Sequence, residues 1–157
     1  MKSCALLLAT AAAYSAPKAD DLPGFEIAAG VSMPALNVGH PDDGSTADEN
    51  VELWVSLGGR GIDTAYDYHN QAQIAEGVES VMKSGIKRTD LFITTKISPG
   101  ECTREAALAA VKEDVKELDG ITPDLVLHPG TKGAAVLAGT SPCPPVTNDL
   151  CIALYAV

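Results

Sequence analysis

The chain has 157 residues, of which 46% are hydrophobic and 20% charged, and its net charge is −10. This length suits one domain with a hydrophobic core, but it is shorter than the roughly 250 residues of a complete (β/α)8 barrel. Nucleic acid is disfavoured as a partner, because an acidic chain repels a phosphate backbone and only 4% of its residues are aromatic. Anionic membrane surfaces are disfavoured by the same charge.

The first 16 residues have the pattern of a targeting leader. Lys2 supplies a positive start, and the apolar run Cys4–Ala13 ends in small residues that suit signal cleavage. This run is too short to span a bilayer, so no membrane contact is expected once the leader is removed. We expect delivery to the secretory pathway or, because Tyr14 and Pro17 follow the cleavage point, to a plastid. The alternative is a buried N-terminal helix in a cytoplasmic protein.

The cysteines do not indicate a metal site. Cys4 lies in the leader, and the other three, Cys102, Cys143 and Cys151, are not in C-x-x-C spacing. We predict no bound metal and free thiols, with a Cys143–Cys151 disulfide as the alternative in an oxidising compartment.

Beyond the leader, the run Phe25–Val38 contains two short apolar stretches around a turn. Gly30 suits a turn position with positive φ, and Pro34 restricts Met33 to an extended conformation. The pattern predicts a β-hairpin that leads into a first strand at Ala35–Val38.

Alternating strands and amphipathic helices follow. The first helix is predicted after the loop at Gly39–Ser45, with Ser45 or Thr46 as its cap, and it ends at Gly58–Gly59. The further predicted strands are Gly61–Ala65, Leu91–Lys96 and Asp124–His128. The apolar helix faces are predicted to contain Val51, Trp54 and Val55; Ile74, Val78, Val81 and Met82; and Leu108, Val111, Val115 and Leu118. The charged residues of the last helix, expected on its exposed face, are Glu113, Asp114, Lys116 and Glu117. This alternation predicts right-handed βαβ units and a parallel sheet.

Four polar residues are expected at one edge of this sheet. Asp63, Lys96 and His128 lie at or near the ends of successive strands, and Tyr68 follows in a loop on the same side. Each has a structural alternative when taken singly: a loop cap, a surface lysine, a structural histidine or a tyrosine at the edge of the core. Together they indicate chemistry, because the C-terminal edge of a barrel is where active sites lie. A lysine ammonium beside a tyrosine hydroxyl makes the phenol a stronger acid, which suits proton donation to a carbonyl oxygen.

These motifs resemble the N-terminal half of the aldo-keto reductase family over residues 25–129. The segments that carry the resemblance are Met33–Leu36, Gly61–Ala65 with Tyr68 and Asn70, Leu91–Lys96, and Asp124–Pro129. The resemblance implies an α/β fold, an incomplete (β/α)8 TIM barrel of about four βα units preceded by an N-terminal hairpin. It also implies an oxidoreductase that reduces small-molecule aldehydes or ketones to alcohols with NADPH. By the same resemblance, Tyr68 is the proton donor, Lys96 and Asp63 tune it, His128 orients the substrate, and Gly39 and Asp63 contact the cofactor.

The sequence departs from the family in several places. Gln71 stands where the family usually has Glu, and Asn37–His40 replaces the usual G-x-G-T. One apolar residue is missing between Asp124 and His128, which turns His128 to the other face of the strand unless a bulge absorbs the slip. Residues 130–157 show no regular period, so we expect an irregular tail and open sheet edges. The alternative function is therefore a truncated, non-catalytic half-barrel that acts as a binding or assembly partner or pairs with a second copy.

Overall fold

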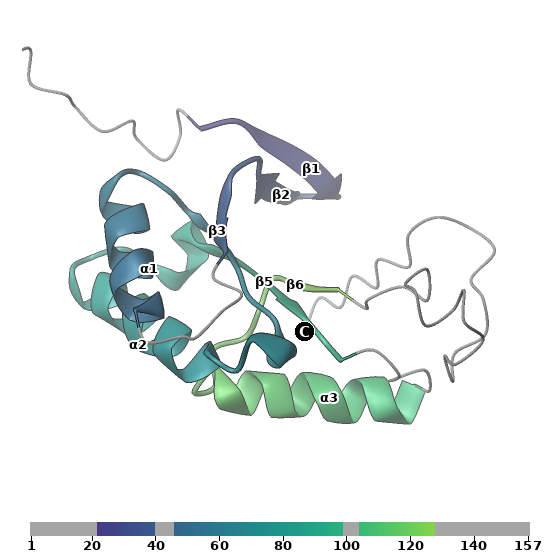
Figure 1. Cartoon of the computed structure of the whole chain (residues 1–157). Helices are drawn as coiled ribbons and strands as arrows, with labels where there is room; N and C mark the ends of the chain where they lie inside the picture. The colour runs from purple at the N-terminus through teal and green to yellow at the C-terminus, as the bar shows by residue number, and fades with distance from the viewer. Residues whose placement is uncertain (1–21, 40–45, 99–103, 128–157) are drawn as a thin grey trace, which may run out of the picture.

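The computed structural model describes residues 22–39, 46–98 and 104–127 (Figure 1). The predicted leader at 1–16, the predicted tail at 130–157, the cysteines and His128 lie outside this described part. Within it, none of the helices is long and apolar enough to cross a membrane.

The predicted hairpin is confirmed, but the strand after it begins later than predicted. β1 (Gly24–Ala28) and β2 (Val31–Pro34) are antiparallel, and Gly30 in their turn has a φ of +74°. The following strand, β3, spans Asn37–Gly39 and not Ala35–Val38. Ala35 instead donates its N–H to the carbonyl of Pro23 at 2.8 Å, which keeps it at the base of the hairpin.

The core of the fold is a parallel sheet of four strands in the order β3-β4-β5-β6. β4 spans Gly61–Asp63, β5 spans Phe92–Lys96 and β6 spans Leu125–Leu127. β4 is shorter than the predicted Gly61–Ala65: Thr64 and Ala65 lie between the end of the strand and a 3-10 helix, η2 (Tyr66–Tyr68). Because the four strands are parallel, their C-terminal ends lie at the same edge of the sheet.

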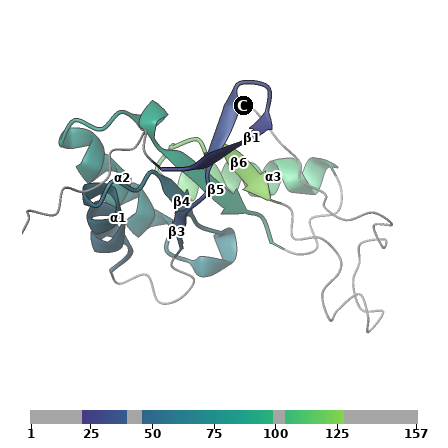
Figure 2. The same ribbon diagram turned by 90° about the horizontal axis from the view of Figure 1, so that it is seen from above.

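Helices follow the first three parallel strands in turn. α1 spans Ala47–Ser56, α2 spans Gln71–Lys83 and α3 spans Arg104–Glu117, and a 3-10 helix, η3 (Arg88–Asp90), precedes β5. Figure 1 shows α1 beside α2, with α3 along the lower side of the sheet and the hairpin above it, and Figure 2 shows the hairpin from above. Parallel strands in chain order, each joined to the next by a helix, are the arrangement of part of a (β/α)8 barrel.

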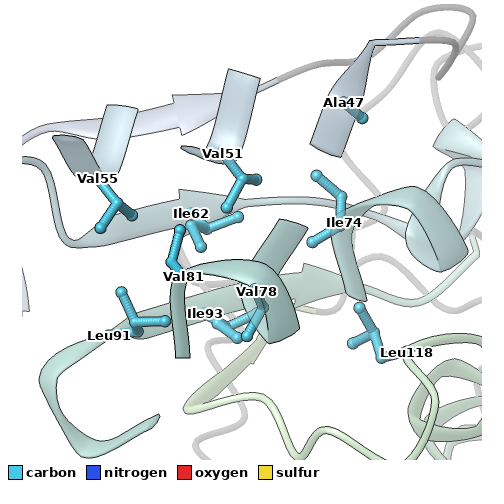
Figure 3. Close-up of a cluster of buried hydrophobic side chains, with 10 residues drawn as sticks. All are labelled: Ala47, Val51, Val55, Ile62, Ile74, Val78, Val81, Leu91, Ile93 and Leu118. Atoms are coloured by element: carbon cyan, nitrogen blue, oxygen red, sulfur yellow. The ribbon is translucent and has the colours of Figure 1, made fainter. Parts of the chain in front are cut away.

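The hydrophobic core lies between α1, α2 and the strands β4 and β5 (Figure 3). Its buried members are Ala47, Val51, Val55, Ile62, Ile74, Val78, Val81, Leu91, Ile93 and Leu118. The prediction that Met82 belongs to the buried apolar face of α2 is wrong, since Met82 is 40% exposed. One residue further along a helix turns a side chain by about 100°, which takes Met82 off the face that Val81 buries.

The helix ends are set by backbone geometry more than by side-chain caps. Thr46 is at the N-terminal cap position of α1 as predicted, but its side chain makes no capping bond and instead accepts from the Asn50 amide at 3.3 Å. Gly58 and Gly85 follow α1 and α2 with φ values of +96° and +109°, as expected of glycines that end helices. Trp54, predicted on the apolar face of α1, is half-buried and donates its ring N–H to Gly61 O at 2.8 Å.

The predicted exposed face of α3 contains one error. Lys116 and Glu117 are exposed, but Asp114 is fully buried, with 0% exposure. Asp114 lies three residues after Val111 and four before Leu118, so helical spacing places it on the inward face. The prediction was wrong because it gave more weight to the charge of the residue than to this spacing.

Candidate active site

Lys96 is the centre of the polar site at the C-terminal edge of the sheet. It is the last residue of β5, and its ammonium donates to Asp63 Oδ1 at 2.6 Å, to Thr64 O at 3.1 Å and to Tyr68 Oη at 3.2 Å. A lysine ammonium has three N–H donors and no acceptor. All of its donors are therefore used, and the cation is held by three acceptors, one from the last residue of β4 and two from the segment that follows it.

Tyr68 receives a hydrogen bond from this cation, which decides what its hydroxyl can do. Because the oxygen accepts from Lys96, the hydroxyl's own hydrogen is available to donate to another group. The ammonium is also 4.7 Å from the centre of the tyrosine ring. The loop that carries Tyr68 is tied to the segment after β5, since Ser98 Oγ donates to Asp67 Oδ1 at 2.6 Å.

Asp63 is the third member of the group and lies beside the neighbouring strand β3. The side chains of Asp63 and Lys96 are 36% and 26% exposed, so the ion pair is accessible from the edge of the sheet. Gly39 is paired with Asp63 across the sheet, and a β-carbon at Gly39 would lie 3.8 Å from Asp63 Oδ2, at ordinary contact distance. The predicted residues Asp63, Tyr68 and Lys96 are thus brought together with Gly39 beside them, while His128 lies outside the described residues.

A second polar cluster, which sequence reasoning missed, lies beneath this site. The Gln71 amide donates to Thr95 Oγ1 at 3.2 Å and also to Asp114 Oδ1. The three residues are 3%, 0% and 0% exposed. Burial raises the pKa of the Asp114 carboxyl, and the hydrogen bonds from Gln71 and Thr95 only partly offset this effect. The helical spacing of Asp114 was the signal that could have revealed this cluster.

The family model described as the Aldo/keto reductase family matches residues 32–128. The chain belongs to the aldo-keto reductase family. It is 34% identical to glyoxal reductase from Bacillus subtilis over 105 residues, which cover 64% of this chain and 37% of that protein. It is 38% identical to morphine 6-dehydrogenase from Pseudomonas putida over 107 residues, which cover 66% of this chain and 34% of that protein.

A solved structure of the family supports the same assignment. Bombyx mori aldo-keto reductase in complex with NADP is similar with a TM-score of 0.59 and 25% identity, over 68% of this chain and 37% of that one. The predicted aldo-keto reductase fold, a partial (β/α)8 barrel, is therefore confirmed. The chain spans about a third of the length of the curated relatives it matches, with 33% of one and 34% of another covered.

Proposed function

We propose that this site belongs to an oxidoreductase that reduces aldehyde or ketone carbonyls to alcohols with NADPH, with Tyr68 as the proton donor. The observation that supports the proposal best is the set of hydrogen bonds made by Lys96. They leave Tyr68 as an acceptor toward the protein and a donor toward anything bound at the edge of the sheet.

The proton transfer follows from this arrangement. The Tyr68 hydroxyl donates its hydrogen to the carbonyl oxygen of the substrate, on which negative charge develops during reduction. The phenolate that remains is stabilised by the Lys96 ammonium, which already donates to the same oxygen at 3.2 Å. Asp63 holds that ammonium in place through the 2.6 Å ion pair. The phenol is then restored by a proton from solvent.

The residues at this edge suit the nicotinamide end of NADPH. NADPH, when bound, supplies the hydride that reduces the carbonyl carbon. Asp63 and Gly39 would hold this end of the cofactor, because they are paired across adjacent strands and Gly39 adds no side chain over the Asp63 carboxylate. The chemistry of the site is also suitable for carbonyl reduction, because Tyr68 supplies a proton donor and the fixed Lys96 ammonium lies beside it.

Tyr68→Phe tests the proposal in the full chain. Glyoxal reduction is followed by the loss of NADPH absorbance, and NADPH binding is measured separately by calorimetry. We expect Tyr68→Phe to lower kcat by about 10²–10⁴-fold, the usual contribution of a positioned acid, with little change in NADPH binding. Tyr66→Phe is the matched control, because Tyr66 lies in the same 3-10 helix but contacts the His69 ring and not Lys96.

Two results would contradict the proposal. Equal rates for Tyr68→Phe and the parent chain would remove Tyr68 from the reaction. A parent chain that neither binds NADPH nor reduces a carbonyl would favour the alternative, a non-catalytic half-barrel that acts as a binding or assembly partner.

A further inference from the structure

We infer that Asp114 is a positioning residue for this site: acting through Gln71 and Thr95, it holds the start of α2 and the end of β5 so that Tyr68 meets Lys96. The inference rests on the proposed function, and it concerns residues that do not touch the reacting atoms. Its evidence is the buried cluster of Gln71, Thr95 and Asp114 that joins three separate elements.

The end of β5 connects the cluster to Lys96. Side chains alternate along a strand, so Thr95 and Lys96 point to opposite faces of the sheet. Lys96 faces Asp63 and Tyr68, whereas Thr95 faces the helices, as does Ile93 in the hydrophobic core. A hydrogen bond that fixes Thr95 therefore fixes the backbone from which Lys96 extends.

The start of α2 connects the same cluster to Tyr68. Gln71 is the first residue of α2 and lies three residues after Tyr68, so its side chain ties down the C-terminal side of the loop. On the N-terminal side, the hydroxyl of Thr64 donates to Asn70 Oδ1 at 3.4 Å, and both of these residues are 1% exposed. The loop that carries Tyr68 is thus fixed at both ends by buried side chains.

Asp114 supplies the third attachment point, from α3. Its Oδ1 accepts from the Gln71 amide, and the same amide donates to Thr95 Oγ1, so Gln71 joins α3 to β5. A leucine at this position would fill the space but could not accept from Gln71, so the Gln71 amide would lose a partner that orients it. An asparagine would keep one carbonyl oxygen for Gln71, and it is therefore the conservative replacement.

The first test compares Asp114→Leu with Asp114→Asn in the full chain. The nuclear magnetic resonance signal of the Lys96 ammonium, assigned with Lys96→Met, reports its hydrogen bonds directly and requires no activity. We expect Asp114→Leu to shift or lose this signal while the far-UV circular dichroism stays unchanged, and Asp114→Asn to retain it. In the reduction assay, Asp114→Leu should lower kcat by about tenfold or more with KM nearly unchanged, as misplacement of a catalytic group does.

A second pair of variants decides the question if Asp114→Leu fails to fold. Thr95→Val removes only the hydroxyl, and Thr94→Val makes the same change one residue away, where the buried hydroxyl has no hydrogen-bond partner among the described residues. Thr95→Val should disturb the Lys96 signal, and Thr94→Val should not. The inference is overturned if Thr95→Val and Thr94→Val behave alike, or if a folded Asp114→Leu keeps the parent signal and kcat. A parent chain without activity would refute the proposed function only, because the Lys96 signal still tests the positioning.

Discussion

Gln71→Glu should destabilise the chain strongly, because it places a second carboxylate against Asp114 in a buried site. The substitution removes the amide that donates to Thr95 Oγ1 and Asp114 Oδ1, and two lost hydrogen bonds of this kind amount to about 2 kcal/mol. Two like charges about 4 Å apart repel by about 4 kcal/mol at an effective dielectric constant of about 20. The two effects sum to about 6 kcal/mol, and proton uptake by one carboxyl of the pair relieves the repulsion, so we expect a loss of about 2–6 kcal/mol in the free energy of unfolding at neutral pH.

The loss should depend on pH in a defined direction. Burial already raises the pKa of Asp114 above its ordinary value of 3.8, so the folded chain binds this proton more tightly than the unfolded chain does. Such a group favours folding at low pH, and its contribution is lost as the pH rises above the unfolded value. A second carboxylate beside Asp114 enlarges this effect, so Gln71→Glu should be less destabilising at pH 5 than at pH 8.

Urea unfolding followed by circular dichroism at these two pH values measures the effect. The double variant Gln71→Glu/Asp114→Asn exchanges the amide and the carboxylate, and it should recover most of the lost stability. Gln73→Glu makes the same chemical change two residues along α2 at a half-buried position and serves as the control, with an expected change within about 0.5 kcal/mol. The reasoning is refuted if Gln71→Glu is as stable as this control, or if its loss of stability does not grow with pH.

Two further predictions concern the packing of the sheet and helices, and both use the same unfolding assay. Gly77→Ala should destabilise the chain by about 1–2 kcal/mol, although alanine favours helices. The new β-carbon would lie 2.8 Å from the backbone oxygen of Asp48 and would force α1 and α2 apart. A higher urea concentration at the unfolding midpoint would contradict this. Asp124→Ala should lower the free energy of unfolding by about 2–3 kcal/mol, because Asp124 Oδ2 accepts from Arg88 at 2.7 Å and from the N–H of Ile93 at 2.8 Å. An unchanged midpoint of urea unfolding would show that neither hydrogen bond contributes.

Local pattern was sufficient to predict the helices and strands and to predict that Asp63, Tyr68 and Lys96 lie together at the C-terminal edge of the sheet. Apolar spacing placed the helix faces apart from Met82 and Asp114, and β-branched runs placed the strands to within a few residues. Asp63 and Lys96 were predicted to converge because parallel strands end at one edge. The register of β4 and β5 pairs Asp63 with Thr94, so Lys96 lies two residues beyond it and its ammonium reaches back to the Asp63 carboxylate. The position of Tyr68 followed from its short distance in sequence from Asp63.

Tertiary structure alone decided which partners the buried polar side chains bind. Asp114 and Gln71 are 43 residues apart in sequence, and no local pattern states that α3 brings one against the other. The same holds for Thr64, whose backbone carbonyl binds Lys96, because every residue has a carbonyl and only the fold selects one. Sequence periodicity thus determines which face of an element turns inward, whereas the partner that a polar group finds there depends on how separate elements pack, since desolvation and hydrogen bonding act between them.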